Sequence, residues 1–220
     1  MLAKISVCVC LALSISSCAS LQMDKAASPL SNSGVDSQAA EDFAARLLPV
    51  AALPDDLLMQ QRVTVRWQDR KESFEAVLQK RGSELLLLGL GPMNTVGFKL
   101  ILDDRGVSFE NRSGRAMLLE PERILADVQR VFYPWIEPSS DCFNCERAGI
   151  RAGVEILERI GSKSLEERRF GLPGSPERGE IVVRYERWRE DRLAPSRAVL
   201  TNGWFGYELI IETMHVERIE

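Results

Sequence analysis

Apolar and polar side chains alternate at a period of two between residues 63 and 109, and this pattern restricts that part of the chain to β-structure. Val63, Val65 and Trp67 alternate with arginine and threonine, which places the three on one face of a strand. Turn-forming sequences such as Asp103–Gly106 separate the apolar runs. The pattern predicts an antiparallel meander with one apolar face to be covered, its five strands at 63–67, 74–78, 85–90, 96–102 and 107–109.

A helix is predicted at 121–133 to provide that cover. Pro121 suits the first turn and Pro134 ends the segment. Apolar residues recur between them at helical spacing, namely Ile124, Leu125, Val128, Val131 and Phe132. Polar residues occupy the opposite side, which is expected to face solvent, namely Glu122, Arg123, Asp127 and Arg130. Further strands are predicted at 165–170, 181–185 and 207–211. The expected fold class is α+β, mainly antiparallel, forming an incomplete, half-open β-barrel with covering helices.

The N-terminus predicts export. One charge, Lys4, precedes an apolar run from Ile5 to Ile15 that is too short to span a bilayer. The run Ile15-Ser16-Ser17-Cys18 resembles the bacterial lipobox. The resemblance implies that Cys18 receives a diacylglycerol after cleavage of a signal peptide, residues 1–17. The alternative is an ordinary signal peptide with an incidental cysteine.

Residues 18–40 are predicted to form a lipidated N-terminus and tether, and residues 41–220 the folded domain. The tether is rich in serine, alanine and other small or polar residues, which bury too little apolar surface to fold. Residue 19 is alanine and not aspartate. By resemblance to the enterobacterial sorting rule, this favours the outer membrane, with the domain facing the periplasm.

Two cysteines remain in the folded part, Cys142 and Cys145, spaced as Cys-x-x-Cys. In an oxidising compartment this pair favours a local disulfide, while free thiols and a redox pair are the alternatives. A zinc site would need further ligands, and His215 is the one histidine of the chain. We therefore predict no metal site.

Composition argues against several classes of function. The chain has 28 basic and 32 acidic side chains and a net charge of −4, whereas nucleic-acid binding needs a clustered positive excess. A single histidine leaves little for Ser–His or Cys–His catalysis, and no Gly-x-Ser-x-Gly elbow occurs. We predict no catalytic residue, no cofactor, no enzymatic activity and no nucleic-acid partner.

The run from Leu85 to Phe98, Leu-Leu-Leu-Leu-Gly-Leu-Gly-Pro-Met-Asn-Thr-Val-Gly-Phe, resembles the strand–loop–strand of the lipoprotein-localisation proteins LolA and LolB. The sequences at 124–127, 133–135 and 206–209 resemble a family of uncharacterised bacterial lipoproteins of LolA/LolB-like fold, often encoded near aryl-polyene lipid synthesis. The resemblance covers residues 45–215. It implies a half-open barrel whose apolar interior accepts acyl chains without a cofactor.

The resemblance places the ligand in the interior of the sheet, under the helix. The predicted cavity residues are Val65, Trp67, Phe74, Leu78, Phe98, Leu100, Ile124, Leu125, Val128 and Phe132. Pro92 and Met93 are predicted to contact membrane or cargo, since an exposed apolar loop tip has no use in folding. Here Met93 and Asn94 stand where LolB has leucine and glycine. The alternative is that Met93 folds back into the core.

Together these features predict a monomeric, outer-membrane-anchored lipoprotein that binds or transfers acyl chains of lipids or lipoproteins in an apolar barrel cavity. A structural or scaffolding lipoprotein, whose core is filled by its own side chains, is the alternative. A lipid hydrolase is a third possibility without a supporting motif.

Overall fold

The computed structural model of the protein describes residues 43, 46–114, 117, 119–137, 142–162, 164–173, 179–191 and 193–219. The predicted signal peptide, Cys18 and the tether lie outside these residues. The strands are β1 (Leu57–Trp67), β2 (Arg70–Arg81), β3 (Glu84–Leu90), β4 (Val96–Asp103), β5 (Gly106–Asn111), β6 (Cys145–Arg151), β7 (Val154–Ile160), β8 (Leu165–Gly171), β9 (Ile181–Trp188), β10 (Pro195–Asn202) and β11 (Tyr207–Arg218). The helices are α2 (Pro121–Phe132) and two short 3-10 helices, η1 (Val50–Ala52) and η2 (Pro92–Asn94).

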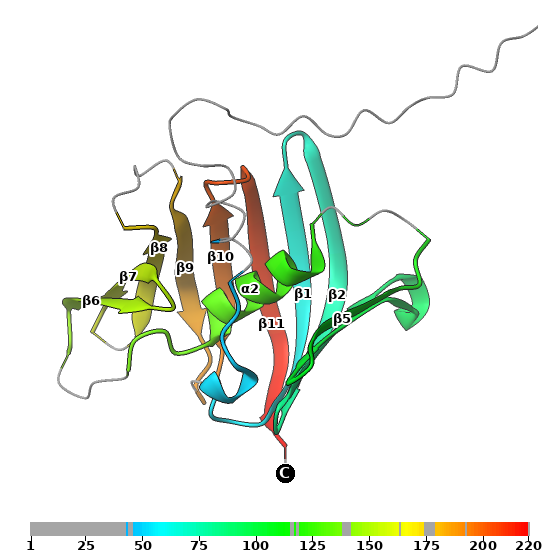
Figure 1. The fold of residues 1–220 in the computed structure, drawn as a ribbon, viewed down its shortest axis with the longest axis horizontal. Helices are drawn as coiled ribbons and strands as arrows, with labels where there is room; N and C mark the ends of the chain where they lie inside the picture. The colour runs from blue at the N-terminus through cyan, green and yellow to red at the C-terminus, as the bar shows by residue number, and fades with distance from the viewer. Residues whose placement is uncertain are drawn as a thin grey trace, which may run out of the picture. The chain divides into compact units, whose positions relative to one another are not determined.

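All eleven strands form one antiparallel sheet, in the order β5-β4-β3-β2-β1-β11-β10-β9-β8-β7-β6 (Figure 1). Strands that follow one another in the sequence pair with each other, except β5 and β6, and at the centre β1 pairs with β11. The sheet is therefore two meanders, β1–β5 and β6–β11, joined through the first and the last strand. The predicted five-strand meander is confirmed in β1–β5.

The predicted fold class is wrong. The described residues form a single open sheet with one α-helix, so the fold is nearly all antiparallel β, without a set of covering helices. The physical reason lies in β6, β7 and β10, which the sequence pattern does not predict. Inward positions of β6 and β7 carry Arg147, Arg151 and Glu158, so the apolar alternation is interrupted. The three strands raise the share of β-structure, and β5 and β6 remain as the two edges of the open sheet.

The position of α2 follows from this topology. Strands β5 and β6 occupy opposite edges of the sheet, so the chain between them has to cross one face, and α2 lies in that connection. Figure 1 shows α2 lying across β10, β11 and β1. Its residues Leu125, Val128 and Val131 are buried. We call the face that α2 covers the inner face.

Period-two burial determines which side chains reach the inner face. In β1 the residues Met59, Gln61 and Val65 are buried, while Gln60 and Arg62 between them are exposed. The main core continues over the inner faces of both meanders, with Leu78, Leu85, Leu100, Phe170, Ile181 and Leu200 fully enclosed. At the start of β6, Cys142 and Cys145 form a disulfide with their Cα atoms 5.7 Å apart.

Candidate functional site

An apolar cavity of about 230 Å³ lies between the inner face and α2. Its walls come from β1–β4, from β11 and from the helix, so both ends of the chain contribute to it. The cavity exceeds the roughly 150 Å³ that holds a benzene molecule in an engineered apolar site. It is the candidate functional site.

Six of the ten residues predicted for the cavity line it: Val65, Phe74, Phe98, Ile124, Val128 and Phe132. Leu78, Leu100 and Leu125 do not, because they are packed in the solid core with at most 1% exposure. Trp67 is half-buried against the core and also lies outside the lining. The sequence pattern gives the inward-facing residues but not where the core is empty.

Sequence reasoning missed several lining residues, among them Gln61, Glu72, Gly89, Leu209 and Ile211. Gln61 occupies the inward phase of β1, two residues before Val63, and a strict period-two reading would have found it. Gly89 has a steric role, because a Cβ there would lie 2.0 Å from the Phe98 ring. The ring therefore packs directly on the β3 backbone and forms one wall.

The loop between β3 and β4 borders the cavity and presents an exposed apolar side chain. Gly91 lines the cavity, and two residues later Met93 is 94% exposed. Met93 and Asn94 both have left-handed backbones, with φ of 57° and 58°. Asparagine adopts this conformation readily, but for methionine it costs about 1–2 kcal/mol. Hydrogen bonds from Gly91 N to Thr95 O (2.7 Å) and from Thr95 Oγ1 to Pro92 O (2.9 Å) hold the loop closed.

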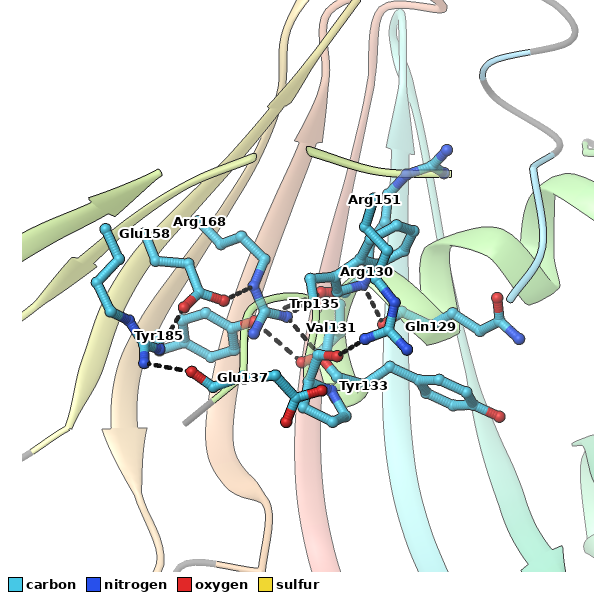
Figure 2. Close-up of polar contacts among 12 residues, drawn as sticks. Gln129, Arg130, Val131, Tyr133, Trp135, Glu137, Arg151, Glu158, Arg168 and Tyr185 are labelled. Atoms are coloured by element: carbon cyan, nitrogen blue, oxygen red, sulfur yellow. Dashed lines mark hydrogen bonds and ion pairs between the residues drawn. The ribbon is translucent and has the colours of Figure 1, made fainter. Parts of the chain in front are cut away.

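Side chains of the sheet fix the C-terminal end of α2. The last carbonyls of a helix have no partner within the helix. Here the Arg168 guanidinium donates to the carbonyl oxygens of Arg130 (2.8 Å) and Tyr133 (3.0 Å), and the Tyr185 hydroxyl donates to that of Val131 (3.0 Å). The positive charge also suits the negative end of the helix dipole. We call Arg168 and Tyr185 the helix clamp (Figure 2).

A buried ion-pair network supports the clamp. Glu158, almost fully enclosed, accepts from Arg168 Nε at 2.7 Å and from Arg147 at 2.5 Å. Arg151 donates to the carbonyl oxygen of Pro134 at 2.6 Å. Figure 2 shows Arg168 between Glu158 and the backbone at the end of α2. The inward-facing charges of β6 and β7 therefore hold the helix over the cavity.

The side of α2 that was expected to face solvent is partly buried. Asp127 and Arg130 are 1% and 2% exposed, because Asp127 faces β11 and the segment preceding β1 packs against Arg130. Arg130 donates to the carbonyl oxygen of Phe43 at 3.0 Å, and Gln129 exchanges two hydrogen bonds with the backbone of Leu48. The helix is thus enclosed from both sides.

Asp127 connects α2 to β11 at the cavity wall. Its carboxylate accepts from Arg130 at 2.8 Å and from the Tyr207 hydroxyl, and Asn202 donates to that hydroxyl at 2.9 Å. Burial raises the pKa of Asp127, against the opposing effect of the Arg130 charge. Burial and then the negative charge of Asp127 hold the pKa of Tyr207 well above its ordinary value. Every polar atom named here has a partner, so these four side chains have a structural role: they connect α2 to the sheet.

The three tyrosines of the chain should ionise only on unfolding. Burial raises the pKa of Tyr133 and of Tyr185 to about 12, and that of Tyr207 is also raised. An unfolded phenol ionises near pH 10. Because the folded-state values are higher, this contribution to stability is complete below pH 10 and is lost as the pH rises from 10 through 12. We expect phenolate absorbance and loss of tertiary circular dichroism to appear together in an alkaline titration. Ionisation of a tyrosine near pH 10 in folded protein would contradict this.

The described residues give no sign of a metal site or of a membrane-crossing helix. Within the described ranges, no three His, Cys, Asp or Glu side chains gather in an arrangement that holds a metal ion. No helix in that part of the chain has both the length and the apolar character needed to cross a bilayer.

Comparison with known proteins identifies the family. The profile of the family described as "Protein of unknown function (DUF3261)" matches residues 58–215. The chain belongs to this family. A search of curated proteins found no match.

Several solved structures are similar at low identity. A LolA superfamily protein from Nitrosomonas europaea is 12% identical, with a TM-score of 0.49 over 84% of this chain and 94% of that one. A putative outer membrane lipoprotein-sorting protein domain from Vibrio parahaemolyticus is 10% identical, with a TM-score of 0.41 over 83% and 91%. A DUF1329 family protein from Desulfovibrio piger is 12% identical, with a TM-score of 0.41 over 82% and 92%.

Proposed function

We propose that the protein is an outer-membrane-anchored, periplasm-facing lipoprotein that binds or transfers acyl chains, without catalysing a reaction. The observation that carries this is the apolar cavity between the inner face and α2. Valine, leucine, isoleucine and phenylalanine side chains dominate its walls. Each methylene that leaves water for such a site contributes about 0.8 kcal/mol, so an alkyl chain is the ligand class that gains most there.

The Met93 loop supports transfer at a membrane or to a second lipidated protein. An exposed apolar tip contributes nothing to the core, yet the backbone holds it in a costly conformation. The tip adjoins the cavity through Gly91. Methionine is flexible and polarisable, which suits contact with an irregular lipid surface.

Anchoring is proposed from the lipobox-like run that ends in Cys18. Two or three acyl chains on one cysteine hold a protein firmly to a bilayer, since stable anchoring needs more than one chain. The tether at 18–40 would then separate the domain from the membrane. We expect the full chain to sediment with outer membranes and the Cys18→Ser variant to lose this association.

Binding is tested with the full chain carrying Cys18→Ser, recovered from the periplasm without its anchor. Calorimetric titration with decan-1-ol measures affinity for a neutral alkyl chain. Glu72 at the exposed end of the cavity argues for a neutral probe. In the same background, Ala76→Phe places a ring in the cavity from a lining position that is 2% exposed. We expect it to weaken binding at least tenfold.

Val77→Phe is the matched control, because Val77 is the next residue of β2 and points to the opposite face. It should bind decan-1-ol as the parent protein does. Equal affinity of Ala76→Phe and Val77→Phe would place the ligand elsewhere. An absence of binding to the parent protein would favour the structural lipoprotein with no ligand.

A further inference from the structure

The cavity has a polar group at its enclosed end that apolar ligands do not need. Gln61 lines the cavity and is 2% exposed. Its amide nitrogen donates to Sδ of Met59 at 3.7 Å, and a thioether sulfur is a weak acceptor. Among the described residues, no donor reaches its side-chain oxygen. The oxygen is thus a hydrogen-bond acceptor without a partner, at the surface of a cavity whose walls are mainly apolar.

A second unpartnered group lies beside it. Thr213 is directly opposite Gln61 in the pairing of β1 with β11, so the two side chains share the inner face. Thr213 is 6% exposed, and its hydroxyl has no hydrogen-bond partner among the described residues. Buried polar groups without partners are unfavourable. The cavity lining includes Gln61 but not Thr213, so the unpartnered oxygen of Gln61 is the atom that a ligand in the cavity can satisfy.

The chemistry of these groups selects the ligand atom. An amide and a hydroxyl carry no charge, so they cannot compensate a buried carboxylate or ammonium. A hydroxyl fits, because it donates to an amide oxygen and can also accept a hydrogen bond.

The depth of the site follows from the strand register. Val65 pairs with Glu72, which is exposed at the open end of the cavity. Gln61 is four residues from Val65 along β1, or about 13 Å. An extended chain advances roughly 1.2 Å per bond, so a ligand needs about eleven bonds to reach from the level of Glu72 to that of Gln61.

We propose that Gln61 binds the hydroxyl group of a hydroxylated alkyl or acyl chain at the enclosed end of the cavity, with Thr213 as the neighbouring polar group. The inference rests on the proposed function and specifies its ligand class: a chain with a second polar group about eleven bonds from the group at the open end.

The test compares two neutral probes that differ by one hydroxyl. Decane-1,10-diol has eleven bonds between its oxygens, and decan-1-ol lacks the distal one. Both are titrated into the Cys18→Ser chain and into the same chain with Gln61→Met, which keeps length but removes the acceptor. We expect the affinity ratio of diol to alcohol to fall at least tenfold in Gln61→Met, since a site that pairs with a hydroxyl discriminates strongly against an unpaired one. Thr213→Val should lower the ratio less.

Gln60→Met is the matched control, because Gln60 is exposed on the other face of the same strand. Its ratio should equal that of the parent. If both probes bind and the ratio is the same in Gln61→Met and Gln60→Met, the inference fails while the proposed function stands. If neither probe binds the parent, the proposed function fails. If Gln61→Met does not fold, two other measurements decide. The inference is overturned if the parent shows no preference for the diol and if Thr213→Val leaves the affinity ratio of diol to alcohol unchanged.

Discussion

Replacing Arg168 with methionine should lower the free energy of unfolding by about 3–5 kcal/mol, the usual result of breaking a buried ion pair from one side. Arg168 is 5% exposed, and its loss removes one of the two arginines that pair with the enclosed Glu158. It also removes the guanidinium that donates to the carbonyl oxygens of Arg130 and Tyr133. Equilibrium denaturation in urea measures the change.

Arg66→Met is the control for this prediction. Arg66 also forms an ion pair, with Glu208 at 2.8 Å, but its side chain is 51% exposed. Exposed pairs contribute about 0–1 kcal/mol. If Arg168→Met cost no more than Arg66→Met, the helix clamp would be irrelevant to stability, and α2 would be held by apolar packing alone.

Phe170→Ala should be comparably destabilising, by about 3–5 kcal/mol, the range for emptying a buried aromatic site. Phe170 is fully buried, and its ring meets the Trp135 ring edge-on with the centroids 4.9 Å apart. The site is enclosed by the sheet and the segment after α2, so it cannot collapse easily. Thermal and urea unfolding provide the measurement.

Phe143→Ala is the comparison for Phe170→Ala. Phe143 is 68% exposed, and exposed substitutions change stability by about 0.5 kcal/mol or less. A small loss for Phe170→Ala would show that the pocket around Trp135 refills, and that the second meander packs less rigidly than its burial indicates.

The first meander and α2 were predictable because their apolar residues follow one period each. Strands β6 and β7 were not, because Arg147, Arg151 and Glu158 point inward. Arg147 and Arg151 donate to backbone carbonyls of the segment after α2. Glu158 pairs with Arg168 of β8, which in turn donates to the backbone at the end of α2. A charged residue at an inward-facing position argues against a strand in the sequence pattern, because its distant partner becomes known only from the structure.

The candidate site was predictable only in part, for a related reason. Periodicity identifies the inner face, and six predicted residues do line the cavity. It does not identify where α2 leaves space, since that depends on how the connection from β5 to β6 crosses the sheet. The same crossing, and the segment before β1, bury Asp127 and Arg130 on a helix face that looks solvent-exposed in the sequence.

The pairing of β1 with β11 has a consequence for how the chain matures. Leu209 and Ile211 of the last strand form part of the cavity wall, so the N-terminal meander has an unpaired central edge until β11 has been synthesised. Contacts between such distant segments form slowly, and the exposed edge of β1 is open to wrong partners meanwhile. Ligand binding should therefore begin only after β11 has paired with β1, and a chain ending before β11 should need chaperone protection.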